Sequence, residues 1–310
     1  MEMENFRFLI TEEQEDERID KCIGGLIGSL SRSYIQKLIG EGQVLVNGKP
    51  VKANYRLKAE DEVLMWIPEA IEPDIEPENI PLDILYEDED ILIVNKPKGM
   101  VVHPAAGHYS GTLVNAIMYH CKDQLSGING VMRPGIVHRI DKDTTGSIIV
   151  CKNDFSHIFI AEQLKKHSLN RKYRAICLGR LKEEELTIHK PIGRHPNDRK
   201  KMAVNLNGKD AVTHVKVLKY FEKYSYIECS LETGRTHQIR VHMASIGHPL
   251  LGDEVYGNTK AAFCKDVPVN LQGQVLHAMT LGIIHPRTRE YLEVNAPLPA
   301  YFEKLLENLV

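Results

Sequence analysis

The sequence contains no C-x-x-C pair, although six cysteines are scattered along its 310 residues. This distribution argues against a zinc site or a disulfide framework and is typical of a reducing cytoplasm. Long apolar runs are also absent, because no stretch approaches the roughly 20 residues that a membrane helix needs. The acidic N-terminus lacks the basic and then apolar pattern of a signal peptide. The sequence therefore predicts a cytoplasmic protein without a membrane segment.

The common motifs of nucleotide and hydrolase sites are missing as well. The sequence has no G-x-x-x-x-G-K-[ST] loop, no G-x-G-x-x-G after a strand and no G-x-S-x-G elbow. His237 and His242 are five positions apart, which is not the spacing of two metal ligands on one helix face. We therefore expect no metal, no nucleotide cofactor and no serine-hydrolase chemistry.

Charge is unevenly distributed, which the net charge of −3 conceals. Residues 59–95 hold 13 acidic side chains and no lysine or arginine, whereas residues 21–58 hold seven bases and one acid. Residues 96–310 hold 30 bases, 20 acids and all 14 histidines. Two basic blocks around an acidic one favour phosphate binding, which depends on the local field. Solvated surfaces give the same pattern, so charge alone leaves both interpretations open.

Residues 1–67 are expected to form a small domain with its core at residues 16–65. Apolar residues at helical spacing predict one helix from Ile19 and a second helix after Ser31, which is a candidate N-cap. Gly40 and Gly42 would end the second helix. A compact helical pair followed by strands is therefore predicted.

A basic hairpin follows these helices. Asn47 and Gly48 predict a type I′ turn between two short strands. Arg32 and Lys37 on the second helix would lie beside Lys49 of the hairpin. A helix face and a hairpin of this charge suit a phosphate backbone better than base edges.

Residues 68–84 are acidic and contain four prolines, which prevent a regular helix or a central strand. We interpret them as a semi-rigid linker and residues 85–310 as a second domain. Strand candidates there outnumber helix candidates and lie too close together for repeated βαβ crossovers. The predicted strands cover residues 90–96, 147–152, 172–178, 212–220, 226–231 and 291–295. An α+β domain with a mixed, largely antiparallel sheet is predicted.

The densest polar segment is HRIDKDTTG at residues 138–146, directly before a strand. Rigidly held loops are where function concentrates. Asp141 is flanked by basic residues and would stay ionised, ready to act as a nucleophile. From this segment alone, a turn-capping aspartate with surface bases is favoured over a nucleophile.

A second polar segment covers residues 233–243. Thr236 is a candidate N-cap for a helix that buries Ile239 and Met243. His237 and Arg240 would then share one helix face at i, i+3.

Together these segments resemble the RluA-type family of pseudouridine synthases over nearly all of residues 85–310. The resemblance is carried by ILIVNKPKG at 91–99, HRIDKDTTG at 138–146, RKYRA at 171–175 and GRTHQIRVH at 234–242. Ile140 and Thr145 stand where leucine and serine are commoner in that family. Residues 16–65, with GQVLVNG at 42–48, resemble the αL RNA-binding module. The arrangement is similar to the RluD-like branch, whose members modify uridines in a stem-loop of large-subunit ribosomal RNA.

The resemblance implies a pseudouridine synthase fold and the isomerisation of specific uridines to pseudouridine. Asp141 would assist cleavage of the glycosidic bond, and whether it attacks the sugar or promotes elimination stays open. Arg240 would hold the Asp141 carboxylate, and Tyr173 would stack on the extruded uracil. Arg139 would brace the space that the base vacates. The reaction would need no metal, ATP or redox cofactor.

The expected partner is RNA, and nothing in the surface pattern requires a dimer. The same chemistry on transfer RNA, or a catalytically silent RNA-binding or ribosome-assembly factor, are the alternative functions. The residues assigned to RNA or base binding are His138, Arg139, Thr144, His237, Arg32, Lys37 and Lys49.

Overall fold

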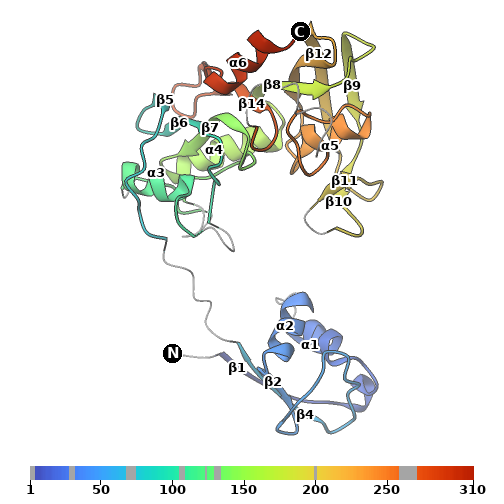
Figure 1. Cartoon of the computed structure of the whole chain (residues 1–310). Coiled ribbons are helices and arrows are strands. Elements are labelled where there is room, and N and C mark those ends of the chain that lie inside the picture. Colours follow the sequence, from blue (N-terminus) through green and yellow to red (C-terminus); the bar gives the residue numbers. More distant parts are fainter. Residues whose placement is uncertain are drawn as a thin grey trace. The chain divides into compact units, whose positions relative to one another are not determined.

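The computed structural model describes residues 4–27, 32–67, 75–104, 109–122, 124–128, 134–198, 201–257 and 271–310. The chain divides into two compact units, Met1–Glu72 and Pro73–Val310 (Figure 1). No helix among the described residues is both long enough and apolar enough to cross a membrane.

The first unit is a four-stranded antiparallel sheet with two helices. Its strand order is β1-β4-β2-β3. The elements are β1 (Glu4–Leu9), a 3₁₀ turn (Glu12–Gln14), α1 (Ile19–Ile27), α2 (Arg32–Gly40), β2 (Val44–Val46), β3 (Lys49–Pro50) and β4 (Glu62–Ile67). The apolar stripes of α1 and α2 pack with the inner faces of β2 and β4 in one core. Strand β1 was not expected in this acidic stretch, and Phe6 and Phe8 attach it to that core.

The local signals of the first unit are largely confirmed. Asn47 and Gly48 have φ angles of 50° and 73°, the pair of positive values that a type I′ turn requires. Helix α2 ends at Gly40, and Gly42 follows with a φ of 76°. Ser31, the expected N-cap of α2, lies outside the described residues.

The second unit is built on a nine-stranded sheet of order β5-β6-β7-β14-β8-β13-β12-β9, with β15 paired to β14. All pairs are antiparallel except β7 with β14, so the predicted mixed, largely antiparallel α+β sheet is confirmed. Its strands are β5 (Ile84–Glu87), β6 (Ile91–Lys96), β7 (Thr145–Cys151), β8 (Asn170–Leu178), β9 (Glu185–His189), β12 (Val212–Tyr220), β13 (Tyr224–Leu231), β14 (Leu276–Ile284) and β15 (Tyr291–Asn295).

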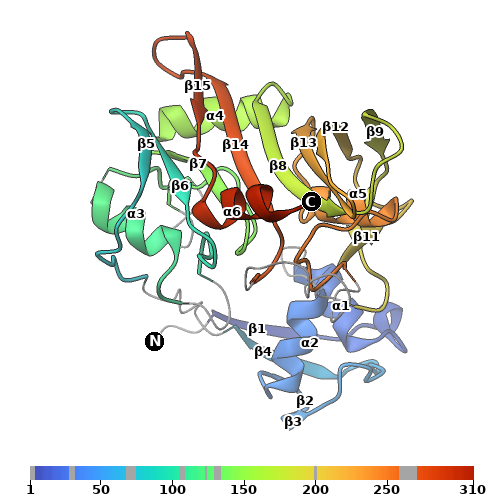
Figure 2. The same cartoon turned by 45° about the horizontal axis from the view of Figure 1, so that its top comes forward.

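Helices cover both faces of this sheet. They are α3 (Leu113–Cys121), α4 (Asp154–Lys165), α5 (Gln238–Ser245) and α6 (Ala300–Asn308). Successive side chains of β6 point to opposite faces, so Leu92 and Val94 pack with α3 whereas Ile91 and Ile93 pack with α4. Figure 2 shows α4 crossing behind β14. A separate hairpin of β10 (Ile192–Arg194) and β11 (Met202–Val204) lies next to α5 (Figure 1).

Part of the segment interpreted as a linker belongs to the second unit. Residues 75–83 contain no helix or strand, as their prolines predict, but Ile75 is buried in the core beside α3. Asn115 of α3 donates to the carbonyl of Glu76 (2.8 Å), and the N–H of Glu78 donates to the carbonyl of Asn115 (2.9 Å). The backbone groups of an extended segment find partners on a helix here, so this stretch is not a free spacer.

Candidate active site

A cavity of about 330 Å³ lies where the loop before β7, strand β8 and the start of α5 meet. Its lining includes all the site residues predicted within residues 85–310. These are His138, Arg139, Asp141, Thr144, Tyr173, His237 and Arg240. The structure thus brings the two polar segments and the tyrosine strand to one cavity.

Asp141 lies in a turn that its main chain closes, because the N–H of Thr144 donates to the Asp141 carbonyl (3.1 Å). Ile140 is buried in the core and fixes this loop. The Asp141 side chain instead meets Arg240, 99 positions away, whose Nη1 donates to Oδ2 (2.9 Å). The carboxylate is 16% exposed, so it is largely withdrawn from water and still reaches the cavity.

The other edge of the Arg240 guanidinium is held by Asp253. Nε donates to Oδ2 of Asp253 (2.7 Å) and Nη2 donates to Oδ1 (3.0 Å). Burial opposes the charge of Arg240, but both carboxylates favour it and raise its pKa above the usual range. Such a planar, doubly held guanidinium is a fixed donor. Arg240 therefore orients Asp141 from a buried anchor.

The start of α5 differs from the prediction. Thr236 does not cap the helix, which begins at Gln238 after His237 adopts a left-handed conformation (φ 57°). The Gln238 side chain accepts from the hydroxyl of Thr233 (2.7 Å), and this bond fixes the preceding loop instead. His237 is turned toward the cavity, with Nε2 3.7 Å from Oδ1 of Asp141. Burial lowers the pKa of His237, and the charge of Asp141 opposes that shift.

Tyr173 is 8% exposed and lines the cavity from β8, where burial raises its pKa. Two arginines accompany it. Arg171 is equally buried and donates to the carbonyl of Glu232 (3.3 Å), and no described carboxylate pairs with it. Arg139 is exposed, with Nη1 3.3 Å from Nε2 of His103. The cavity therefore carries more positive than negative charge.

His138 and Thr144 stabilise the Asp141 loop through side-chain hydrogen bonds. Nε2 of His138 accepts the N–H of Ile149 on β7 (3.1 Å), which requires that nitrogen to be unprotonated. Burial, together with the charge of Arg171, lowers the pKa of His138 to about 3. The Thr144 hydroxyl accepts from the side chain of Gln274 (3.0 Å). Both side chains fix the loop by these bonds.

Lys96, at the end of β6, stabilises the loop that carries Asp141. Its ammonium donates to the carbonyls of Pro97 (2.8 Å), Met100 (2.9 Å) and Lys142 (2.9 Å). The N–H of Gly99 also donates to the Lys142 carbonyl (3.0 Å). Burial lowers the pKa of Lys96 to about 7. The motif at residues 91–99 thus holds the residue that follows Asp141.

The two histidines considered for metal binding point apart. His242 is fully buried, with Nδ1 2.9 Å from the hydroxyl of Thr213 and Nε2 2.9 Å from the carbonyl of Lys190. His237 faces Asp141 instead. These two side chains do not offer converging ligand atoms.

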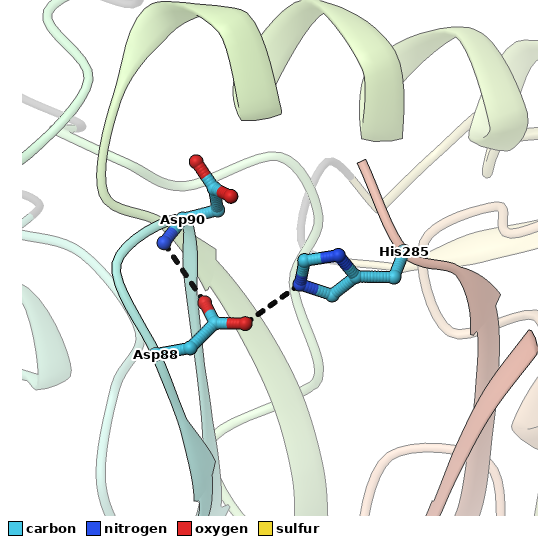
Figure 3. A group of neighbouring side chains, drawn as sticks. All are labelled: Asp88, Asp90 and His285. Atoms are coloured by element: carbon cyan, nitrogen blue, oxygen red, sulfur yellow. Dashed lines mark hydrogen bonds and ion pairs between the residues drawn. The ribbon is translucent and has the colours of Figure 1, made fainter. Parts of the chain in front are cut away.

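A different group, Asp88, Asp90 and His285, does bring three ligand atoms within 4.8 Å (Figure 3). Its members already have partners: His285 contacts Asp88 (2.7 Å), and Arg287 holds Asp90 with two hydrogen bonds (2.6 and 2.8 Å). Asn153 also donates to Asp90 (2.9 Å). The Arg287 guanidinium supplies the positive charge that a metal ion would otherwise bring to Asp90. This favours a structural role, in which the cluster joins the β5–β6 turn, α4 and the end of β14.

The three remaining predicted residues lie in the first unit. Arg32 donates twice to the buried Asp20 (3.0 and 3.3 Å), which also accepts from Arg18. Burial alone would raise the pKa of Asp20, but these bonds lower it well below its usual range. Lys37 and Lys49 are exposed. Lys37 also pairs with Glu41 (3.7 Å). The first unit therefore presents exposed cations on its surface, of which Arg32 is fixed by a buried carboxylate.

Three residues of the second unit were not assigned to the site from sequence. Lys96 and Arg171 lie inside the motifs at residues 91–99 and 171–175, and their burial, which would mark them, cannot be seen in a single sequence. Asp253 lies in an ordinary Gly252-Asp253 pair and has no sequence signal of its own.

Comparisons with known proteins support a family assignment. The family model of RNA pseudouridylate synthase matches residues 90–245, and that of the S4 domain matches residues 25–63. The uncharacterized RNA pseudouridine synthase YlyB of Bacillus subtilis is 52% identical over 96% of each chain. Proteins named ribosomal large subunit pseudouridine synthase D are 45% identical in Zymomonas mobilis, over 97% of this chain and 96% of the relative, and 40% identical in Escherichia coli, over 96% and 92%.

A solved structure agrees with these relatives. Human RNA pseudouridylate synthase domain containing 1 is 26% identical, with a TM-score of 0.56 over 72% of this chain and 85% of that chain. The chain therefore belongs to the RNA pseudouridylate synthase family of isomerases and carries an N-terminal S4 domain.

Proposed function

We propose that this chain converts uridine to pseudouridine in a stem-loop of large-subunit ribosomal RNA, with Asp141 as the catalytic carboxylate. The observation that supports this is the Asp141 side chain, which reaches a 330 Å³ cavity while Arg240 fixes it from behind. In this reaction the N1–C1′ bond breaks and the base turns. C5 then bonds to C1′ and loses its proton, and the freed N1 takes up a proton.

The geometry suits a carboxylate that must stay charged in a site largely withdrawn from water. Arg240 occupies Oδ2 of Asp141, so Oδ1 remains for the ribose. Because Asp253 holds the guanidinium, little reorganisation is needed when charge develops on the sugar. Asp141 assists cleavage of the glycosidic bond from this fixed position.

The uridine has to leave its stack before its sugar can reach Asp141. A cavity of this size accommodates a small ligand, and Tyr173 on its wall offers a ring on which the uracil stacks. Arg139 is exposed at the rim, where it can fill the space that the base vacates. Extrusion costs a few kcal/mol and costs least in a loop, which favours a stem-loop substrate.

Ribosomal RNA is the proposed substrate because of the relatives and the first unit. Relatives at 40–45% identity are named ribosomal large subunit pseudouridine synthase D. The S4 domain carries exposed cations for a phosphate backbone. Transfer RNA with the same chemistry is the second candidate.

The test is tritium release from transcripts labelled at C5 of uridine, using large-subunit ribosomal RNA and transfer RNA. The wild type is compared with Asp141→Asn and with Asp210→Asn, a control at a carboxylate that is 66% exposed. We expect release from the ribosomal transcript by the wild type and by Asp210→Asn, and RNA binding without release by Asp141→Asn. Release from transfer RNA alone would replace the substrate. Tight binding without release, also on assembled subunits, would support a silent RNA-binding factor.

A further inference from the structure

Tyr256 lies behind His237 on the side away from Asp141. Its hydroxyl is 2.8 Å from Nδ1 of His237, and the two rings meet edge to face with centroids 5.6 Å apart. The N–H of Met202, at the start of β11, donates to the same hydroxyl (2.9 Å). The Tyr256 oxygen therefore sits between the β10–β11 hairpin and the imidazole.

These contacts decide where the protons lie. Burial raises the pKa of Tyr256, so its hydroxyl keeps its proton and acts as a donor. The Met202 N–H can only donate, so it uses a lone pair of the oxygen. Among the described residues, Nδ1 of His237 is the acceptor within hydrogen-bond distance of the hydroxyl. Nδ1 is then unprotonated, and a neutral His237 carries its proton on Nε2.

The charged groups around His237 agree with a neutral ring. Those that act on it are Asp141, Arg240, Asp253 and Arg139. The two arginines disfavour an imidazolium and the two carboxylates favour it, while burial, the largest influence, lowers the pKa of His237. The ring thus presents an uncharged N–H to the catalytic carboxylate.

We propose that Tyr256 is a positioning residue, which holds His237 as the Nε2–H tautomer with this donor directed at the Oδ1 side of Asp141. The 3.7 Å gap between Nε2 and Oδ1 is too long for a hydrogen bond and leaves the donor available to a substrate oxygen beside the carboxylate. The catalytic consequence rests on the proposed function, whereas the tautomer does not.

Tyr256 is itself held firmly enough for this role. Its N–H donates to Oδ1 of Asp253 (3.1 Å), and the Arg240 guanidinium lies 5.1 Å from the centre of its ring. One tyrosine therefore contacts both side chains that face Asp141. Replacing it with phenylalanine keeps the ring and removes the hydroxyl alone.

The tautomer is read directly by NMR on full-length protein labelled with ¹⁵N-histidine, without RNA. The His237 signals are identified by their loss in His237→Gln. At pH 7 we expect the two nitrogen shifts of a neutral ring protonated on Nε2. An Nδ1–H ring or an imidazolium at pH 7 would overturn the proposal. Failure of the tritium assay would overturn the proposed function and leave this reading intact.

The consequence is tested with Tyr256→Phe, beside Tyr291→Phe as a control that removes a hydroxyl bonded to Glu293 on β15. Tyr256→Phe ends the hydroxyl's hydrogen bonds to His237 and Met202. The loss of the bond to Nδ1 of His237 should lower kcat about five- to tenfold with an unchanged RNA Kd. Nδ1 becomes free to take a proton, so the acidic limb of the pH–rate profile should move to higher pH. The control should show neither change. An unaltered pH profile and an unaltered His237 tautomer in a folded Tyr256→Phe would refute the role.

Discussion

Asp253 accepts hydrogen bonds from Nε and Nη2 of Arg240, and the two side chains are almost completely withdrawn from solvent, with exposures of 0% for Asp253 and 7% for Arg240. Asp141 accepts only from Nη1 of Arg240. The Asp141 carboxylate is therefore bound to a cation whose direction another carboxylate has already fixed. The position of Asp141 depends on a residue that does not line the cavity.

Asp253→Asn should lower both activity and stability. The new amide nitrogen would face a guanidinium nitrogen. The buried charge of Arg240 would then be balanced by Asp141 alone and no longer by two carboxylates. Breaking a buried pair costs about 3–5 kcal/mol, and a mobile Arg240 should reduce kcat at least about tenfold. Urea unfolding and single-turnover tritium release measure the two effects. Asp210→Asn should change neither, and equal losses in both variants would contradict this role of Asp253.

Gly146→Ala should destabilise the second unit. Gly146 has a φ of 106°, and a Cβ there would collide with the carbonyl oxygen of Ala278, where β7 pairs with β14. Forcing the strands apart is expected to cost about 3 kcal/mol, which thermal unfolding would detect. Gly25→Ala in α1 is the matched control, because nothing lies within 4 Å of its added Cβ. That change should be neutral or stabilise the first unit by up to about 1 kcal/mol.

The sequence was most informative where pattern and burial coincide. Strands at 212–220 and 291–295 were predicted to the residue. Strand β14, which pairs with three other strands, was missed because His277 and Thr280 interrupt its apolar run. His277 is nevertheless fully buried, with Nε2 3.1 Å from the carbonyl of Ala296. His277 can be buried in a strand because the fold brings the Ala296 carbonyl to its ring nitrogen, and the sequence does not reveal this partner.

The candidate site shows the same division. The family motifs brought Asp141 and Arg240 into one hypothesis, although they are 99 positions apart. The N-cap prediction at Thr236 was wrong because His237 takes a left-handed conformation and the helix begins only at Gln238. No local sequence pattern predicts that conformation. Asp253 and Tyr256 act through hydrogen bonds to residues 13 and 19 positions away. Such pairings depend on tertiary packing and not on spacing.

Lys96 should make stability depend on pH. Its pKa falls from 10.5 to about 7 on folding, so between these values the unfolded chain binds more protons than the folded one. The unfolding free energy then rises with pH over this window. Lys96→Met removes that contribution, so the difference between wild type and variant should shift in favour of the wild type from pH 7 to pH 9.5. Urea unfolding at both pH values tests this, with the exposed Lys166→Met as control. A difference that stays constant would show that Lys96 does not titrate on folding.

Lys37 and Lys49 should carry part of the salt dependence of RNA binding. Both are exposed in the first unit, whereas Arg32 is bound to Asp20 and is left unchanged in this test. Each phosphate that the protein no longer neutralises reduces the slope of log K against log salt by about 0.7 to 0.9. The double variant Lys37→Ala, Lys49→Ala should therefore bind more weakly and with a slope shallower by about 1.5. Lys166→Ala, at the C-cap of α4, should leave the slope unchanged. These lysines are expected to neutralise phosphates and not to contact the uridine. We therefore expect no change in kcat at saturating RNA, and a fall in kcat would assign them to the chemical step instead.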